Sequence, residues 1–228
     1  MKTPRLLIVA VLLVSLVASG CSSTKSDLSA DVLLKEVVHK FRASRSTPKM
    51  PDPSAASVVA LRKTDEPLVQ IMFPTIKAAS VLRIIESNGG YDTWAAWGIV
   101  DRRTVTMKRG IITATRAIWR DLMSADVDGV LDLVTRRAEG TAPYTQRYLD
   151  GDHAIIEAKS TCVVSRGYDQ VVDFGEIHEP VLQMFSSCVS ADRQFVDLYL
   201  VDARGRIVQS RQWIGPGMGF AITRRLRF

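Results

Sequence analysis

From Ser57 onward the sequence consists of short β-like runs separated by turn signals about every ten residues. The separators include Asn88-Gly89-Gly90 and Lys108-Arg109-Gly110, which suit tight turns between antiparallel strands. This pattern predicts a mainly β domain over residues 57–228, built as an antiparallel meander. The strands expected are Val58–Arg62, Leu68–Phe73, Val81–Ser87, Asp92–Gly98, Thr104–Lys108, Ile111–Thr115, Tyr144–Leu149, His153–Val164, Gln170–Phe174, Leu182–Val189, Phe195–Val201, Arg206–Ile214 and Phe220–Leu226.

Two segments depart from the β pattern and favour helix. Apolar residues recur at helical spacing between Leu28 and Phe41, which predicts an amphipathic helix. Trp119–Val134 predicts a short helix or two, broken near Asp128-Gly129. Between the first helix and the β region, Arg42–Ala56 contains three prolines among small and charged residues. Proline cannot continue a helix, so this stretch is expected to be an extended arm.

The N-terminal stretch Met1–Ser23 has the composition of an export signal. A basic start is followed by an apolar run, which is shorter than the roughly 20 residues that a membrane-spanning helix needs, and then by small residues and Cys21. Small residues directly before a cysteine resemble the lipobox of bacterial lipoproteins. The resemblance implies a signal peptide over residues 1–20 and an acylated Cys21 that holds the protein on a membrane through its lipid chains. The alternative is ordinary secretion, with cleavage nearby.

The residue after Cys21 indicates to which membrane the lipoprotein would be sorted. In enterobacterial sorting rules, aspartate at this place retains a lipoprotein on the inner membrane, whereas this chain has Ser22. By analogy we expect a lipid-anchored protein of the outer membrane that faces the periplasm. Residues 21–56 then form the lipidated tether, the helix and the arm.

The net charge of the chain gives little further evidence about its localisation. The formal charge of +6 falls to +4 when residues 1–20 are removed, because Lys2 and Arg5 leave with them. This modest positive balance is scattered along the chain and is typical of a solvated surface, with anionic lipid or an acidic glycan as the alternative partner. The envelope compartment excludes nucleic acid as a partner.

Two cysteines remain once Cys21 is set aside. In an oxidising compartment the even pair of Cys162 and Cys188 favours one disulfide, with two buried reduced thiols as the alternative. A zinc site is not expected, because no third ligand lies at a usable spacing. The three histidines also share no spacing that would favour a metal site, and the sequence predicts no cofactor.

The motifs of the common enzyme classes are absent from the sequence. It contains no Gly-x-Ser-x-Gly nucleophile elbow, and Gly215–Gly219 lacks the βα unit of a dinucleotide-binding loop. Acid pairs such as Glu176 and Glu179 would serve glycoside hydrolysis only if the fold set them about 5–10 Å apart across a cleft. The sequence therefore predicts no catalytic residues.

The most distinctive stretch lies near the end of the chain, from Asp202 to Pro216. On an alternating strand, Gln209, Arg211 and Trp213 share one face with Ile207. Such a face can contact a glycan or a partner, by hydrogen bonds and by stacking of the tryptophan ring. The alternative is a buried polar network that closes a barrel seam.

Several segments resemble the YjbF/GfcB family of lipoproteins. They are Gly110–Arg116 (GIITATR), Tyr148-Leu149, the pair Cys162 and Cys188, Phe195–Tyr199, and above all Gly205–Trp213 (GRIVQSRQW) with Pro216. The similarity covers most of residues 57–228. The chain departs from the family pattern at Ala117, where a glycine is expected, at Asp197, where an asparagine is expected, and in Gln183–Ser187, which lacks a glutamate.

This resemblance implies a fold and a function. The fold is an open or distorted barrel of antiparallel strands with an N-terminal helix and arm. The function is that of a non-catalytic outer-membrane lipoprotein that assists secretion or assembly of exopolysaccharide or group 4 capsule. Its partners would be membrane lipid, through acylated Cys21, and polysaccharide-export proteins or the polysaccharide itself. A structural envelope lipoprotein and a periplasmic glycan-modifying enzyme are the alternatives.

Overall fold

The computed structural model describes residues 55–97, 102–149 and 154–228. These residues form one antiparallel sheet of twelve strands with few helices. The helices are α3 (Ala55–Lys63), the 3-10 turn η1 (Pro74–Ile76) and α4 (Asp128–Thr135). The strands are β1 (Leu68–Phe73), β2 (Ala78–Asn88), β3 (Tyr91–Ala96), β4 (Thr104–Lys108), β5 (Ile111–Arg116), β6 (Leu122–Asp126), β7 (Gly140–Leu149), β8 (Ile155–Phe174), β9 (Ile177–Val189), β10 (Gln194–Asp202), β11 (Ile207–Gly215) and β12 (Gly219–Arg227).

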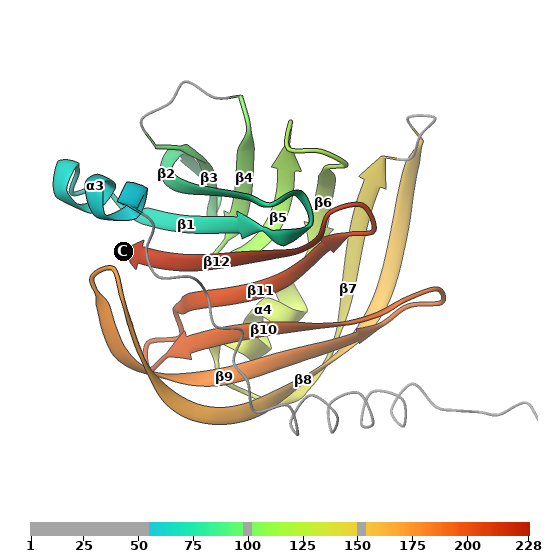
Figure 1. The fold of residues 1–228 in the computed structure, drawn as a ribbon. Coiled ribbons are helices and arrows are strands. Elements are labelled where there is room, and N and C mark those ends of the chain that lie inside the picture. Colours follow the sequence, from blue (N-terminus) through green and yellow to red (C-terminus); the bar gives the residue numbers. More distant parts are fainter. Residues whose placement is uncertain (1–54, 98–101, 150–153) are drawn as a thin grey trace, which may run out of the picture.

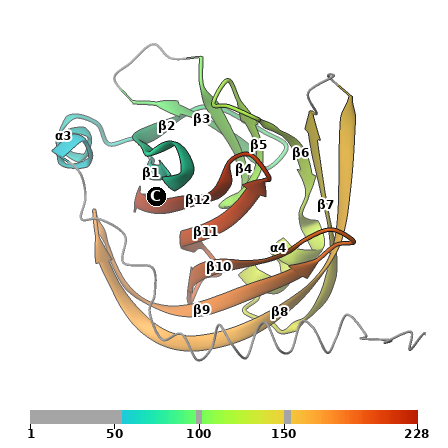
Figure 2. The same ribbon diagram turned by 45° about the vertical axis from the view of Figure 1, so that its right-hand side comes forward.

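The sheet is a meander that returns to its own beginning. Its strand order is β5-β4-β3-β2-β1-β12-β11-β10-β9-β8-β7-β6, so β12 pairs with β1, and the two edge strands, β5 and β6, are consecutive in the chain. The sheet curls into a barrel that is closed except for one seam between these edges (Figure 1, Figure 2). The prediction of a mainly β meander forming an open barrel is confirmed.

Three local predictions are wrong. Residues Val58–Arg62 lie in helix α3 instead of a strand. The two valines suggested a strand, but both are exposed, and the alanine, leucine and basic residues around them favour helix. Residues Leu122–Asp126 form strand β6 instead of a helix. The two strands expected at His153–Val164 and Gln170–Phe174 are one strand, β8, because the pairing with β9 only shifts register between Arg166 and Asp169.

The predictions for the N-terminal part fall on residues outside the described ranges. These are the signal peptide, Cys21, the helix at Leu28–Phe41 and the proline-containing arm, except that Ala55 and Ala56 begin helix α3.

Side chains bridge the seam between β5 and β6. The Arg116 guanidinium donates to the carbonyls of Leu122 and Met123, at 3.2 and 3.1 Å. The backbone N–H of Leu122 donates to Thr115 Oγ1 at 3.0 Å, and this hydroxyl donates to Asp121 at 2.8 Å. These bonds satisfy backbone groups that an open sheet edge would leave unpaired.

The two ends of the barrel differ. Helix α4 connects β6 to β7 and closes one end, where Val130, Leu131 and Val134 are buried in the main core. Lys108, at the same end of β4, lies 2.6 Å from Asp128 at the start of this helix. Because the strands alternate in direction, the β5–β6, β9–β10 and β11–β12 connections gather at the opposite end, away from α3, together with the end of β7 and the start of β8 (Figure 1).

The long β8–β9 hairpin covers part of the outer face of the sheet. It curls over β10 and β11 (Figure 2) and forms a second buried cluster with them. Its tip meets β12, where the backbone N–H of Glu176 donates to the carbonyl of Leu226 at 2.8 Å. Gly175 is required at this contact, because it has a φ of +61° and a Cβ there would lie 2.6 Å from the same carbonyl.

Candidate functional site

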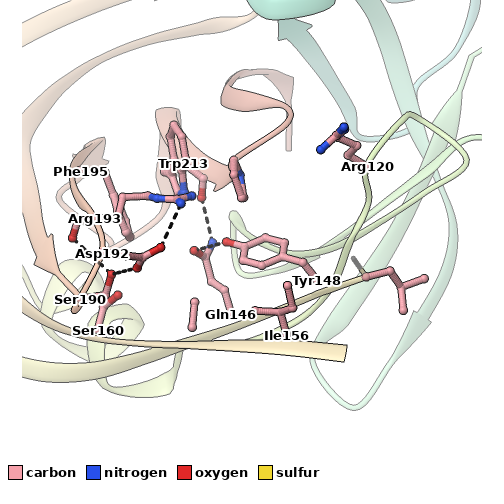
Figure 3. Close-up of a pocket in the computed structure, with 13 residues that line it drawn as sticks. Arg120, Gln146, Tyr148, Ile156, Ser160, Ser190, Asp192, Arg193, Phe195 and Trp213 are labelled. Carbon is pink, nitrogen blue, oxygen red and sulfur yellow. Dashed lines mark hydrogen bonds and ion pairs between the residues drawn. The ribbon is translucent and has the colours of Figure 1, made fainter. Parts of the chain in front are cut away.

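A cavity of about 290 Å³ opens at the end of the barrel opposite α4. Its wall combines the inner faces of β7 and β8 with the β9–β10 turn, the end of β11 and one residue of the β5–β6 loop (Figure 3). Mouths of β-barrels are frequent places for small-molecule sites. The described lining residues are Arg120, Gln146, Tyr148, Leu149, Ile156, Ala158, Ser160, Ser190, Asp192, Arg193, Phe195, Trp213 and Pro216.

The rings of Trp213 and Phe195 line one side of the cavity, and two further aromatic rings pack against them. Trp213 is stacked on Phe195, with ring centroids 6.0 Å apart and an interplanar angle of 23°. Phe220 packs edge-on against Trp213 at 5.3 Å, and Tyr144 packs against Phe195 at 6.2 Å. These contacts hold the half-buried Trp213 ring in one orientation. A fixed, partly exposed indole is a suitable surface for the apolar face of a sugar ring.

Gln146 supplies the polar floor beside these rings. Its Nε2 donates to the carbonyl of Trp213 at 3.0 Å and to the hydroxyl of Tyr144 at 3.2 Å. Its Oε1 accepts a hydrogen bond of 2.5 Å from the hydroxyl of Tyr148. Because Tyr144, Gln146 and Tyr148 alternate along β7, all three point to the inside of the barrel.

A charged pair lies above the Trp213 ring, in the β9–β10 turn. The Arg193 guanidinium is 5.4 Å from the ring centroid and 3.2 Å from Asp192 Oδ2. Ser190 Oγ donates to Asp192 Oδ1 at 2.9 Å. The hydrogen bond from Ser190 and the nearby Arg193 lower the pKa of Asp192, so this carboxylate is ionised and balances the charge of Arg193.

A second carboxyl group lies behind the aromatic group, inside the barrel. Asp197 Oδ1 accepts a hydrogen bond of 2.7 Å from the backbone N–H of Trp213, and the hydroxyl of Tyr199 lies 3.4 Å from Oδ2. Burial raises the pKa of Asp197 to about 7. The side chain is 1% exposed and is not part of the cavity wall, so it positions the Trp213 backbone rather than meeting a ligand.

Of the three residues predicted to share a contact face, the structure places only Trp213 at the cavity. Gln209 is buried, and the Arg211 guanidinium lies over the Phe220 ring at 3.3 Å and donates to the carbonyl of Val196. The pairing of β11 is continuous from Gln209 to Trp213, so these three residues keep the predicted alternation, and the register shifts lie outside this run, next to Ile207 and Gly215. Arg211 and Trp213 both contact the Phe220 ring, but only Trp213 lines the cavity, so contact of all three residues with a glycan or a partner stays a prediction.

The buried polar network considered as the alternative exists on other residues of the same strand. Gln212 accepts a hydrogen bond from the backbone N–H of Ile112 and donates to the carbonyl of Gly110, both at 2.9 Å. It also donates to Ser210, whose hydroxyl lies 2.5 Å from that of Thr223. This network ties β11 to the edge strand β5 across the barrel.

The two remaining cysteines form a disulfide between neighbouring strands. Cys162 of β8 lies directly opposite Cys188 of β9, and both are buried in the main core. This is the bridge favoured by the even cysteine count. It secures the base of the β8–β9 hairpin below the cavity.

The acids considered for glycoside hydrolysis lie elsewhere. Glu176 pairs with Arg227, and Glu179 pairs with Arg206 at 3.1 Å, both at the end of the barrel closed by α4. The described wall of the cavity holds one carboxylate, Asp192. The described residues also contain no group of three or more histidine, cysteine, aspartate or glutamate side chains placed to hold a metal ion.

Most of the cavity was not predictable from local motifs. Arg120, Gln146 and Arg193 come from three distant segments and carry no motif. The alternation of Tyr144, Gln146 and Tyr148 along β7 was the one available signal, since it indicates a polar side chain between two aromatic ones on an inward face.

Comparison with known proteins identifies the family. A family model described as group 4 capsule polysaccharide lipoprotein gfcB, YjbF matches residues 34–226. Among solved structures, the hypothetical lipoprotein YmcC from Escherichia coli (K12) is similar in fold, with a TM-score of 0.66 and 15% identity over 84% of this chain and 95% of that chain. Comparison with curated proteins finds no match. Within the described ranges, no helix has the length and apolar character needed to span a membrane. The chain belongs to the YjbF family of group 4 capsule polysaccharide lipoproteins.

Proposed function

We propose that this protein is a non-catalytic lipoprotein of the outer membrane that assists secretion or assembly of exopolysaccharide or capsule by binding polysaccharide at the mouth of its barrel. In this proposal residues 1–20 are removed, and acyl chains on Cys21 hold residues 21–56 as a tether at the periplasmic leaflet. Residues 57–228 form the binding body. Membership of a family of capsule polysaccharide lipoproteins supports this reading.

The cavity wall is the observation that carries the proposal. It presents the held ring of Trp213 beside the amide, hydroxyl and guanidinium groups of Gln146, Tyr148 and Arg193. Saccharides have apolar ring faces and many hydroxyl groups, so stacking on an aromatic ring combined with planar hydrogen-bonding groups matches both. Glycoside hydrolysis usually needs two carboxyl groups about 5–10 Å apart, whereas the described wall holds one carboxylate. The wall therefore favours binding over turnover.

Complementation of a deletion strain tests the proposal. The strain should export less surface or secreted polysaccharide, and the wild-type gene should restore the output. Trp213→Ala should restore it only in part, because the variant lacks the stacking surface. Tyr91→Ala is the matched control, since Tyr91 is an exposed aromatic residue at the other end of the barrel and should complement fully. Unchanged polysaccharide output with increased detergent sensitivity would instead support a structural envelope lipoprotein.

The anchor is tested separately by Cys21→Ala. We expect this variant to move from the membrane to the soluble periplasmic fraction, because it cannot be acylated. A variant that stays in the outer-membrane fraction would contradict the proposed anchor while leaving the binding site untested, so the fractionation is combined with measurement of bound polysaccharide.

A further inference from the structure

The cavity wall carries one unbalanced positive charge. Two arginines and one aspartate are among its described residues. Arg193 is paired with Asp192, whereas Arg120 forms no ion pair within the described part of the chain. Arg120 is exposed and extends from the β5–β6 loop toward the mouth of the cavity (Figure 3). A guanidinium placed in this way offers a planar donor set for an anionic group of a ligand.

The loop that carries Arg120 has an unusual backbone. Three of its non-glycine residues have a positive φ: Ala117 at 57°, Trp119 at 151° and Arg120 at 46°. Asp121 holds the start of the loop, because its carboxylate accepts hydrogen bonds from the backbone N–H groups of Ala117 and Ile118, at 2.7 and 3.3 Å. Strained conformations persist only where surrounding contacts enforce them, and they occur preferentially at binding and catalytic sites.

Gly217, in the β11–β12 turn, makes room for the arginine. A Cβ at this glycine would lie 2.0 Å from Cδ and 2.9 Å from Cβ of Arg120, so the aliphatic stem of the arginine lies directly against the glycine backbone. Any other residue at position 217 would push the stem away. The contact between the β5–β6 loop and the β11–β12 turn thus fixes the position of Arg120 at the cavity mouth. Because this side chain is already ordered, less side-chain entropy is lost when a ligand binds.

We infer that the cavity selects an anionic saccharide and that Arg120 binds the carboxylate or phosphate group of that saccharide while the ring stacks on Trp213. This inference rests on the proposed function, since it names the class of polysaccharide that the same site takes. Three observations point to Arg120: the net positive charge of the cavity wall, the strained loop that carries this residue, and the contact of its aliphatic stem with Gly217. Arg193, already balanced by Asp192, contributes hydrogen bonds to sugar hydroxyls.

The test measures binding of the complete lipoprotein in detergent to surface polysaccharide purified from the strain that carries the gene. The polysaccharide is used in its native form, after reduction of its carboxylates to alcohols, and after removal of phosphate with cold hydrofluoric acid. Wild-type affinity should fall about tenfold or more after whichever treatment removes the recognised group, at physiological ionic strength. The two treatments separate a carboxylate from a phosphate.

Two variants locate the effect at Arg120. Arg120→Gln should bind native polysaccharide about tenfold or more weakly and should no longer distinguish the native from the treated form. Gly217→Ala keeps the positive charge but displaces the arginine stem, so it should lose most of the same preference. Arg204→Gln is the matched control, because Arg204 is an exposed arginine in the β10–β11 turn at the other end of the barrel. It should change affinity less than twofold.

The outcomes separate this inference from the proposed function. If the wild-type protein binds all three forms equally, or if Arg204→Gln weakens binding as much as Arg120→Gln, the selection of an anion is wrong while saccharide binding stands. If the wild-type protein binds none of the forms, or if Trp213→Ala binds as well as wild type, the proposed function itself fails.

Discussion

Asp197 is an ionisable residue enclosed in the barrel directly behind Trp213. It is 1% exposed, and burial raises its pKa from 3.8 to about 7. In the unfolded chain the group ionises near pH 4, whereas in the folded protein it holds its proton up to about pH 7. Folding therefore binds a proton in this window, and the stability of the protein falls as the pH rises from about 4 to about 7.

Replacing this acid with its neutral analogue should remove that pH dependence. We expect Asp197→Asn to be more stable than wild type at pH 8, by roughly 2–4 kcal/mol, with the gain shrinking toward pH 4. The amide oxygen still accepts from the N–H of Trp213, and the amide nitrogen donates to the Tyr199 hydroxyl in place of accepting from it. Urea unfolding at pH 4, 6 and 8 measures the difference, and a gain that does not change with pH would contradict this account.

Ala117 is strained because it has a φ of +57°, where a Cβ is unfavourable. We expect Ala117→Gly to stabilise the protein by about 0.5–1 kcal/mol, since relief of the strain exceeds the extra entropy of glycine in the unfolded chain. Ala203→Gly is the control, because Ala203 is an exposed turn residue without a positive φ, and this change should lower stability or leave it unchanged. Thermal unfolding of both variants decides, and equal effects would show that strain at Ala117 is absent.

Both residues were visible in the sequence as departures from the family pattern, Ala117 for glycine and Asp197 for asparagine. What the sequence could not show was the backbone angle at one and the burial of the other, because both arise from contacts with residues far away in the chain. Arg120 shows the same limit, since its position depends on Gly217, about one hundred residues later.

At the scale of elements, strand β11 shows where sequence reasoning stops. Its limits were predicted to within one residue, because β-branched residues and flanking turns mark a strand clearly. Its alternation also holds from Gln209 to Trp213, but the position of the cavity at Trp213 alone could not be predicted, since distant strands build the cavity wall. Strand β6 and helix α3 were misassigned because, over five to nine residues, tertiary contacts outweigh local preference.

Gln212 is the residue of β11 whose loss should matter most for the barrel. Gln212→Ala leaves the buried backbone N–H of Ile112 and carbonyl of Gly110 without their partner, so we expect a loss of about 2–4 kcal/mol. Gln194→Ala is the control, because Gln194 is exposed at the start of β10, and this variant should lose less than about 0.5 kcal/mol. Urea unfolding measures the stability of both variants, and similar losses would show that the hydrogen bonds of Gln212 to β5 do not stabilise the protein.

At the scale of the whole molecule, the barrel is closed by the pairing of β1 with β12, and its seam lies between consecutive strands. The meander could be predicted from the turn spacing. The closure could not, because it depends on how far twelve twisted strands curl, and local sequence does not encode that.

This closure makes the topology circular, which a permuted chain can test. We expect a protein that begins at Gly90 and ends at Gly89, with Phe228 joined to Ala55 by a glycine-serine linker, to form the same barrel. Arg227 donates to the carbonyl of Leu61 at 3.0 Å, so the C-terminal end of β12 lies beside helix α3, which begins at Ala55, and the Gly89-Gly90 turn is exposed. Its unfolding midpoint should lie within roughly 8 °C of the original, with the same disulfide.

The control for the permuted chain is a chain that lacks β12 altogether. It should aggregate, because it exposes the edges of both β1 and β11. A permuted chain that behaves like this truncated chain would contradict the circular arrangement.

The pairing of β12 with β1 also sets the order of events during biosynthesis. Strand β1 leaves the ribosome early but cannot acquire its second neighbour until the eleven later strands have followed. A nascent chain therefore lacks the strand that pairs with both β1 and β11, and the barrel cannot close until β12 has been synthesised.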